Sequence, residues 1–368
     1  MAHRCSLLCG EIIVTLYAKG STSLYRIFRA MKWACFFWLL LISKIICAQT
    51  TGGNSIYSFL SLPSNAQSLA LGGVNVSALS DDVSLAVHNP ASLSERMHGQ
   101  VGISFNNGMK GIKDYQAVGA MWHERYQTNF AFALRYLSYG VFDQTDAAGN
   151  ILGEFRPNEY VVQATASRQY SNYIRYGASI KFIHSAYGQY NSSGIALDLA
   201  LNYHDSSGIQ ASIVLKNMGV QLKTYAGSDE ADLPFDIQLG VSKRLSRAPF
   251  QFSVTAHQLQ RFDISYSDPL FDSVNIVRKK NGFFSKATRH LVFAAQAFPS
   301  KNVELTIAYN FLRRSDLQVT GQASGFSGFS FGAGVLLKQL SIRYGLSIYQ
   351  QGRAFSSFSV NVPLTEFL

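Results

Sequence analysis

The residues best placed for nucleophilic chemistry are His204, Asp205 and Ser206, which follow one another directly. A hydrolytic triad brings such residues together in space, however, and adjacency along the chain does not create one. Asp-Ser-Ser-Gly is also an ordinary turn sequence. We therefore favour a turn at this position, and we predict that the protein is not an enzyme and needs no cofactor.

Metal chemistry finds equally little support in the residue spacing. The histidines His184, His257 and His290 lie far apart and lack the spacing of metal ligands. All four cysteines, at positions 5, 9, 35 and 47, precede residue 49. A mature chain that starts there has no thiolate ligand, cysteine nucleophile or disulfide. We therefore expect no metal site.

The charge distribution argues against nucleic acid as a partner. The formal charge is +10, but the first 48 residues hold six Lys/Arg and one Asp/Glu, which leaves 26 against 21, or +5. The basic residues are scattered, and no zinc-finger, RNP or phosphate-binding glycine pattern is present. A charged content of 15% beside an aromatic content of 13% instead favours a surface that faces lipid.

Residues 31–48 have the pattern of a signal peptide: a lysine, an apolar core over 33–42 and a short tail that ends in Ala48. The core is too short to span a membrane, which takes about 20 residues. We expect cleavage after Ala48. A lipoprotein attachment at Cys47 is less favoured, because the bulky Ile46 stands where a small residue is expected. Residues 1–30 precede a complete signal peptide, so Met31 is a candidate start and 1–30 a misassigned extension.

Two segments show clear alternation with a period of two. In residues 303–311 the apolar side chains of Val303, Leu305, Ile307, Tyr309 and Phe311 share one face, and residues 195–203 alternate in the same way. Such alternation places one face in an apolar medium and the other in a polar, small-residue interior. From residue 99 to the end, no apolar stretch is long enough to span a membrane as a helix.

Counting comparable segments predicts an all-β fold, an antiparallel transmembrane barrel of about fourteen strands over residues 99–368. The expected strands lie near 99–107, 114–124, 128–140, 158–170, 174–188, 193–205, 208–219, 234–245, 249–259, 289–299, 303–314, 326–338, 340–350 and 354–364. Short periplasmic turns are expected to alternate strictly with longer extracellular loops, including 141–157, 220–233, 260–288 and 315–325. A soluble β-sandwich is the competing fold.

A barrel of fourteen strands has a backbone radius of roughly 14 Å, too wide for side chains alone to fill. Residues 49–98 precede the first strand and are long enough to occupy the lumen as a plug or hatch. Asn89 before Pro90 suits the start of a short helix. The alternative is a periplasmic extension with no gating role.

Several of these residues resemble the PorV/PorQ group of FadL-like outer-membrane barrels of Bacteroidetes. The matching residues are Tyr57–Pro63, Ala70–Gly73, Asp81, Asp82, Asn89, Pro90, Ala91, Leu215–Gly219, Leu233–Gly240 and Thr255–His257. The resemblance covers most of residues 52–368. It implies a component of the type IX secretion system that anchors a PorZ-like surface protein and serves the attachment complex containing PorU and PorV.

Charged residues are expected on the luminal face: Arg135, Lys181, Lys216, Arg343, Asp198, Asp236 and Glu304. They either guide a polar solute or pair with one another and with the plug. The longest loop is a candidate partner-binding surface through Tyr266, Phe271, Arg278, Lys279, Lys280, Phe283 and Phe284. Its aromatic and basic residues suit a protein or an anionic lipopolysaccharide, although the same aromatics would also serve a loop folded over the barrel.

We therefore expect a barrel in the bacterial outer membrane, in contact with its lipid, that docks a surface partner of the type IX system. The alternative is a FadL-like transporter of hydrophobic small molecules. A strand interruption beside the plug, with an apolar cavity leading to lipid, would favour transport.

Overall fold

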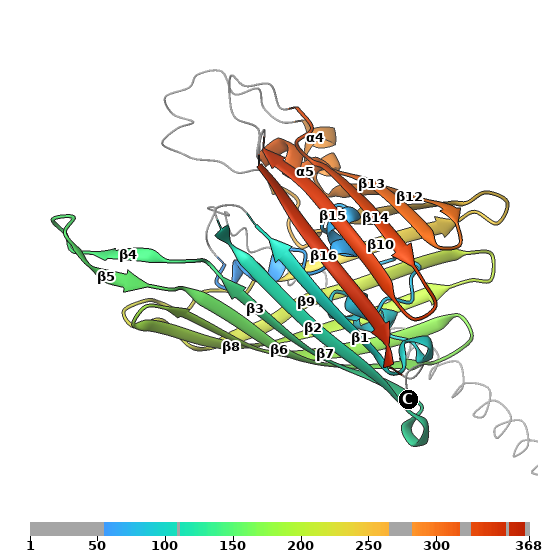
Figure 1. Cartoon of the computed structure of the whole chain (residues 1–368), viewed down its shortest axis with the longest axis horizontal. Coiled ribbons are helices and arrows are strands. Elements are labelled where there is room, and N and C mark those ends of the chain that lie inside the picture. The colour runs from blue at the N-terminus through green and yellow to red at the C-terminus, as the bar shows by residue number, and fades with distance from the viewer. Residues whose placement is uncertain (1–54, 109–110, 265–281, 317–324, 351–352, 365–368) are drawn as a thin grey trace, which may run out of the picture. The chain divides into compact units, whose positions relative to one another are not determined.

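The computed structural model describes residues 55–108, 111–264, 282–316, 325–350 and 353–364, so the expected signal peptide lies outside the described residues. Fourteen strands form one closed antiparallel barrel (Figure 1). They are β1 (Gln100–Asn107), β2 (Lys113–His123), β3 (Thr128–Ser138), β6 (Asn158–Gln169), β7 (Ile174–Tyr187), β8 (Tyr190–His204), β9 (Ile209–Lys223), β10 (Asp236–Arg244), β11 (Phe250–Ala256), β12 (Leu291–Ser300), β13 (Val303–Asn310), β14 (Phe329–Leu336), β15 (Ser341–Gln350) and β16 (Arg353–Pro363). The prediction of about fourteen strands is confirmed.

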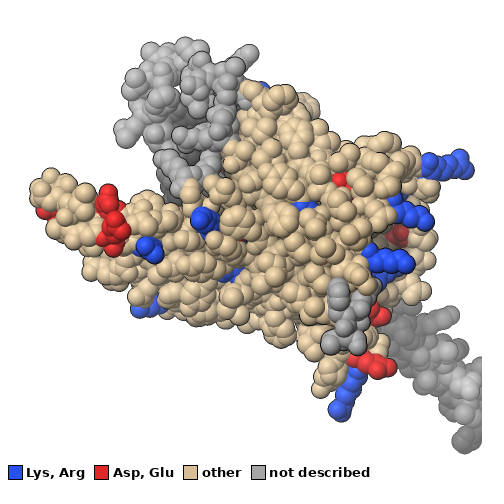
Figure 2. Space-filling model, viewed as in Figure 1, with Lys and Arg blue, Asp and Glu red and all other residues tan. Residues whose placement is uncertain are grey.

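Side chains alternate between the two faces of the barrel as the sequence pattern predicted. In β8, Leu197, Leu199 and Leu201 are exposed on the outside, while Asp198 and Ala200 are buried on the inside. The same alternation holds in β13 and in most other strands. Figure 2 shows few charged residues on the face in view.

This arrangement is apolar outside and polar inside, the reverse of a water-soluble sandwich. Soluble monomers rarely expose contiguous apolar patches larger than a few hundred Å². Pairing of the first strand with the last also closes the sheet, which removes the two open sheet edges that a membrane protein built from strands must avoid. The protein is an outer-membrane β-barrel, and the β-sandwich alternative is wrong.

The connections identify the two ends of the barrel. At one end, six short turns join β2 to β3, β6 to β7, β8 to β9, β10 to β11, β12 to β13 and β14 to β15, which marks the periplasmic end. Longer connections gather at the opposite, extracellular end, but the expected strict alternation is wrong. Two residues join β7 to β8, where Gly188 has the positive φ (60°) common in tight hairpins, and two join β15 to β16.

Other predicted boundaries differ from the structure. The expected loop 141–157 contains a separate hairpin, β4 (Phe142–Thr145) and β5 (Ile151–Phe155), which projects beyond the barrel in Figure 1. Phe311 was expected in a strand but begins the helix α5 (Phe311–Asp316), because β14 pairs with β13 no further than Tyr309. Strand β9 continues to Lys223, beyond the expected residue 219.

Short helices complete the described part of the chain. They are η1 (Ser58–Ser61), α2 (Ala66–Ala70), η2 (Val83–Val87), η3 (Pro90–Ser92), η4 (Glu95–Met97), η6 (Glu124–Tyr126), α4 (Phe283–Arg289) and α5. No helix among the described residues is long and apolar enough to cross a membrane. Five of the eight precede β1, and these five lie inside the barrel.

Candidate functional site

Residues 55–99, here called the luminal segment, pass through the barrel from its extracellular to its periplasmic end. Near the start, the Tyr57 hydroxyl lies 2.5 Å from Ser192 Oγ, close to the extracellular end of β8. At the other end, Gly99 N donates to Ala120 O. Between these points α2 contacts β13 to β16, η2 contacts β1, β2 and β6, and η3 contacts β6, β7 and β8. The first six residues of the expected plug, 49–54, lie outside the described residues, and gating remains a prediction.

The Asn89-Pro90-Ala91 motif forms the predicted short helix and fixes it to the wall. Asn89 caps η3 by accepting from Ala91 N at 2.9 Å, and its amide nitrogen donates to Val76 O and to Asn202 Oδ1 of β8. The helix packs so closely on β7 that a Cβ on Gly177 would lie 2.6 Å from the Pro90 backbone. The motif therefore anchors the luminal segment, and a side chain at position 177 would push it away.

The two adjacent acidic residues of the luminal segment have different environments. Asp82 is buried: it caps η2 through Ser84 N (2.8 Å) and accepts from Arg343 Nη1 of β15 at 2.6 Å. Arg343 also pairs with Glu304 of β13 at 3.4 Å. Asp81 pairs with Arg96 at 3.6 Å, but both side chains are largely exposed (58% and 80%). Asp82 is thus the acidic residue that ties the segment to the barrel.

A second anchor, which the sequence analysis missed, is Arg313 of α5 near the extracellular end. Its guanidinium donates to Gly72 O of the luminal segment at 3.1 Å and to the hydroxyls of Ser330 and Ser347. It also lies 4.5 Å from the centre of the Tyr349 ring. No feature of the sequence distinguished it from its neighbour Arg314, because its role depends on the turn that ends β13.

The charged residues expected on the luminal face do lie there, and most are paired. Arg135 pairs with Asp114 at 2.8 Å and Lys181 with Asp198 at 2.5 Å, with both pairs buried. A buried charge without a partner costs several kcal/mol, so pairing stabilises the wall. Of the two interpretations offered by the sequence, the contacts match charges that pair with one another and with the luminal segment. Asp236, also among the expected luminal residues, accepts from Gln258 N and Gln238.

His88 of the luminal segment faces a cluster of cations. Its Nε2 lies 2.9 Å from Ser64 Oγ and its Nδ1 lies 3.4 Å from Lys216 Nζ. Burial, followed by the positive charges of Lys216, Arg135 and Lys181, lowers the pKa of His88 well below its usual value. His88 is therefore neutral, and protonation would place a further charge among three cations.

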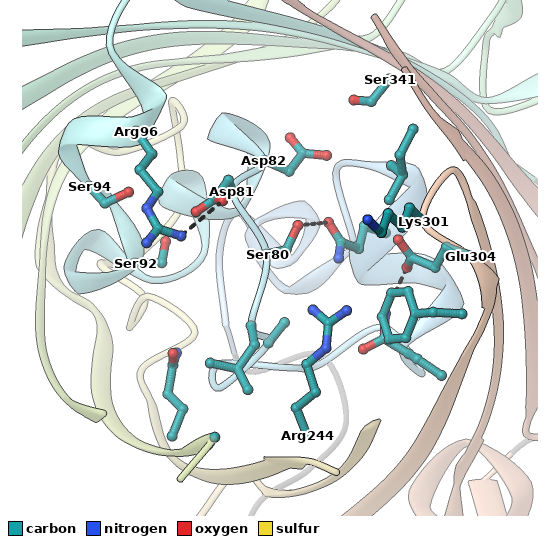
Figure 3. Close-up of a pocket in the computed structure, with 18 of the residues that line it drawn as sticks. Ser80, Asp81, Asp82, Ser92, Ser94, Arg96, Arg244, Lys301, Glu304 and Ser341 are labelled. Carbon is teal, nitrogen blue, oxygen red and sulfur yellow. Dashed lines mark hydrogen bonds and ion pairs between the residues drawn. The ribbon is translucent and has the colours of Figure 1, made fainter. Parts of the chain in front are cut away.

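Below the luminal segment, a cavity of about 1400 Å³ occupies the periplasmic half of the barrel. Its wall is formed by η4, by side chains that face the lumen at the periplasmic ends of several strands, and by the periplasmic turns. Figure 3 shows Arg244 and Lys301 reaching into it from the barrel wall, with the Asp81–Arg96 pair on the luminal segment. We call this cavity the vestibule.

Tyrosines cluster at the extracellular end of the barrel. Tyr139 donates to Glu159 at 2.5 Å, and Tyr225 donates to Ser185 Oγ, which in turn donates to Glu159. Tyr225 lies in the loop after β9, and burial raises its pKa to about 12, so its hydroxyl keeps its proton for this bond. These bonds connect the loops beside the start of the luminal segment.

The wall is interrupted beside this cluster. The register between β8 and β9 shifts between Leu197 and Leu199, and Asn217 has a positive φ of 57°. Strand β10 begins opposite Lys216, so residues 217–223 pair only with β8 in the described sheet. The nearby cavity is small, about 20 Å³, and has both apolar and charged lining.

Only part of the expected partner-binding loop can be placed. Phe283 and Phe284 are exposed (64% and 82%) on α4, with ring centroids 5.8 Å apart. The other five residues proposed for it, Tyr266, Phe271, Arg278, Lys279 and Lys280, lie outside the described residues. The β4–β5 hairpin, which the sequence analysis treated as a loop, adds a second exposed apolar surface, with Ile151 67% and Leu152 66% exposed.

Of the residues considered for catalysis, Asp205 and Ser206 lie in the predicted turn, and His204 is the last residue of β8. Asp205 accepts hydrogen bonds from the hydroxyls of Ser206 and Ser207. The bond from Ser207 contributes most to lowering the pKa of the Asp205 carboxyl. His257 and His290 are neighbours, with His290 Nδ1 2.8 Å from His257 O, but the described residues contain no group of three metal-ligating side chains. The absence of enzymatic activity remains a prediction.

No family model matches the sequence, and no curated protein matches it. Among solved structures, the Pseudomonas putida toluene transporter TodX is 10% identical, with a TM-score of 0.49, and the match covers 85% of this chain and 98% of that one. A Pseudomonas aeruginosa FadL homologue is 10% identical, with a TM-score of 0.44 and coverage of 86% and 100%. The KdgM porin is 4% identical, with a TM-score of 0.32 and coverage of 72% and 98%.

Proposed function

We propose that this outer-membrane barrel is a docking platform whose lumen is held occupied, and that it anchors a PorZ-like surface protein in the type IX attachment complex with PorU and PorV. The observation that supports a platform is the anchoring of the luminal segment at two points: Arg313 holds Gly72 near the extracellular end of the barrel, and Arg343 holds Asp82 nearer the periplasmic end. In a barrel whose lumen stays filled, the extracellular surface is the part available to bind a partner. The assignment to type IX secretion rests on the sequence resemblance.

Two extracellular surfaces are candidates for contact with the partner. The β4–β5 hairpin exposes Ile151 and Leu152, and its strands are joined by the Phe142 and Phe155 rings, whose centroids are 6.0 Å apart. Phe283 and Phe284 on α4 form the other surface. Aromatic and aliphatic residues exposed together outside the lipid band are favourable anchors for a protein partner.

The test is affinity purification of the tagged protein from outer membranes in mild detergent, with mass spectrometry of what co-purifies. The docking role predicts a PorZ-like protein or attachment-complex subunits in amounts comparable to the tagged protein. The double variant Ile151→Ser/Leu152→Ser should reduce this recovery, and Gln144→Ser on the same hairpin should not. If the unaltered protein is recovered without such partners, docking is abandoned.

The alternative is a transporter of hydrophobic small molecules, and the interruption of the wall after Lys216 is the observation that favours it. The start of the luminal segment lies beside this interruption, since Ile56 N donates to Asp232 O of the adjoining loop. The small cavity there is partly lined by Arg135, Lys181 and Lys216, so transport would require the luminal segment to move.

Transport predicts that the tagged protein is recovered alone with bound lipid. It also predicts that proteoliposomes containing it take up a fluorescent fatty acid faster than empty liposomes. Uptake equal to that of empty liposomes, with partner proteins recovered, would leave docking as the function.

A further inference from the structure

The vestibule is too large for an ordinary small-molecule site. Its volume of about 1400 Å³ exceeds the roughly 300–1,000 Å³ of typical ligand pockets. It is lined by residues of the periplasmic turns, so a ligand would enter from the periplasm. A chain-like ligand suits this size and position better than a metabolite.

The charges of the vestibule are unbalanced once the ion pairs are removed. Its lining includes seven Lys/Arg and four Asp/Glu residues. Arg343 pairs with Asp82 and Glu304, and Arg96 pairs with Asp81. Five basic residues are left with one carboxylate, Glu95, and none of the five forms an ion pair within the described part of the chain. They are Arg175, Arg244, Arg247, Lys301 and Lys338.

Two of these cations are already positioned. The Arg244 guanidinium lies 4.4 Å from the centre of the Phe298 ring, which restrains it without neutralising it. Arg175 donates through Nη2 to Gln169 Oε1 at 3.3 Å, but its Nε is buried and has no hydrogen-bond partner. A buried donor without a partner is costly, and a small rotation of the Arg175 side chain, which borders the cavity, would let an incoming carboxylate satisfy it.

We propose that the vestibule binds an acidic segment of a periplasmic polypeptide, with Arg175 and Arg244 each receiving a carboxylate. Besides the cations, its wall offers the amide side chain of Gln210 and the amide nitrogen of Asn202, whose oxygen already accepts from Asn89. Amides both donate and accept hydrogen bonds, as a peptide backbone requires. Polar and charged residues outnumber the apolar ones in the lining, so the cavity suits a polar chain better than the acyl chains of an anionic lipid.

The test uses the purified full-length mature protein in detergent and a fluorescent octapeptide rich in Asp and Glu, followed by anisotropy. We expect binding that weakens as salt rises and is absent for the same peptide with Asn and Gln in place of the acids. Arg175→Gln and Arg244→Gln should each weaken binding about tenfold, the usual effect of losing one charge-assisted hydrogen bond. Heat-modifiable mobility on a gel confirms that each variant is folded.

Arg168→Gln is the matched control. Arg168 lies next to the lining residue Gln169 at the periplasmic end of β6, and alternation places it on the outside of the barrel. Its loss should leave binding unchanged. Equal binding of the neutral peptide, equal loss in Arg168→Gln, or displacement by equimolar inorganic phosphate or anionic lipid vesicles would overturn the proposal. The site lies at the opposite end from the docking surfaces, so either proposal can fail alone.

Discussion

The buried pair between Asp82 and Arg343 gives the sharpest prediction about the luminal segment. Asp82→Asn keeps the size of the side chain but removes its charge and one of its two acceptor oxygens. The amide oxygen can cap η2 through Ser84 N or accept from Arg343, but it cannot serve both at their present positions.

The expected cost follows from burial. Removing one partner of a buried pair typically costs about 3–5 kcal/mol. Here Arg343 keeps Glu304 at 3.4 Å, and the amide introduced at position 82 can keep one hydrogen bond. We therefore expect a loss of about 2 kcal/mol in the free energy that holds the luminal segment in place, or a factor of about 30 in its opening equilibrium.

Amide hydrogen exchange read by mass spectrometry measures this directly. Peptides that cover η2 and η3 should exchange about 30 times faster in Asp82→Asn, while peptides from the barrel strands stay unchanged. Asp81→Asn is the control, because the exposed Asp81–Arg96 pair should contribute less than about 1 kcal/mol. Equal exchange in the Asp82 variant and the unaltered protein would refute the assigned anchor.

Three further predictions concern the same segment. Asn89→Ala removes three buried hydrogen bonds, so we expect the free energy that holds η3 in place to fall by about 3 kcal/mol. Faster protease cleavage of the luminal segment would measure this loss. Gly177→Ala should lower the thermal unfolding midpoint because its Cβ meets the Pro90 backbone, whereas Gly119→Ala, whose Cβ would meet only Val101 at 3.9 Å, should change it little. The depressed pKa of His88 means that the released state binds a proton more readily than the packed state. The contribution of His88 to the stability of the packed segment is therefore complete above about pH 6.5, the usual histidine pKa, and is lost as the pH falls below that value. Protection of the segment's amides against hydrogen exchange, compared at pH 7.5 and 5.5, would detect this loss. His88→Gln should remove this pH dependence, and an unchanged dependence in that variant would assign it to another group.

The anchors bear on both proposals. Docking requires the segment to remain in place, whereas transport past Lys216 requires it to move. A variant that releases the segment, such as Asp82→Asn, should therefore reduce partner recovery if the protein is a docking platform, and should speed fatty-acid uptake if it is a transporter.

The sequence by itself determined the barrel, because alternation with a period of two is a local property that each strand carries independently. Residues 195–203 and 303–310 show which side chains face lipid without reference to any other part of the chain. The cap of Asn89 on η3 was likewise readable, since it joins residues two positions apart. The same locality explains why strand ends were placed within a few residues.

Only the tertiary structure decided how the luminal segment is held in the barrel. Asp82 and Arg343 are 261 positions apart, and Arg313 reaches Gly72 across 241, so no spacing rule could join them. The hairpin of β4 and β5 was missed because both its strands are exposed and lack alternation. The vestibule, too, depends on which charges remain after pairing. Each of these features comes from contacts between distant segments, which closure of the barrel brings together.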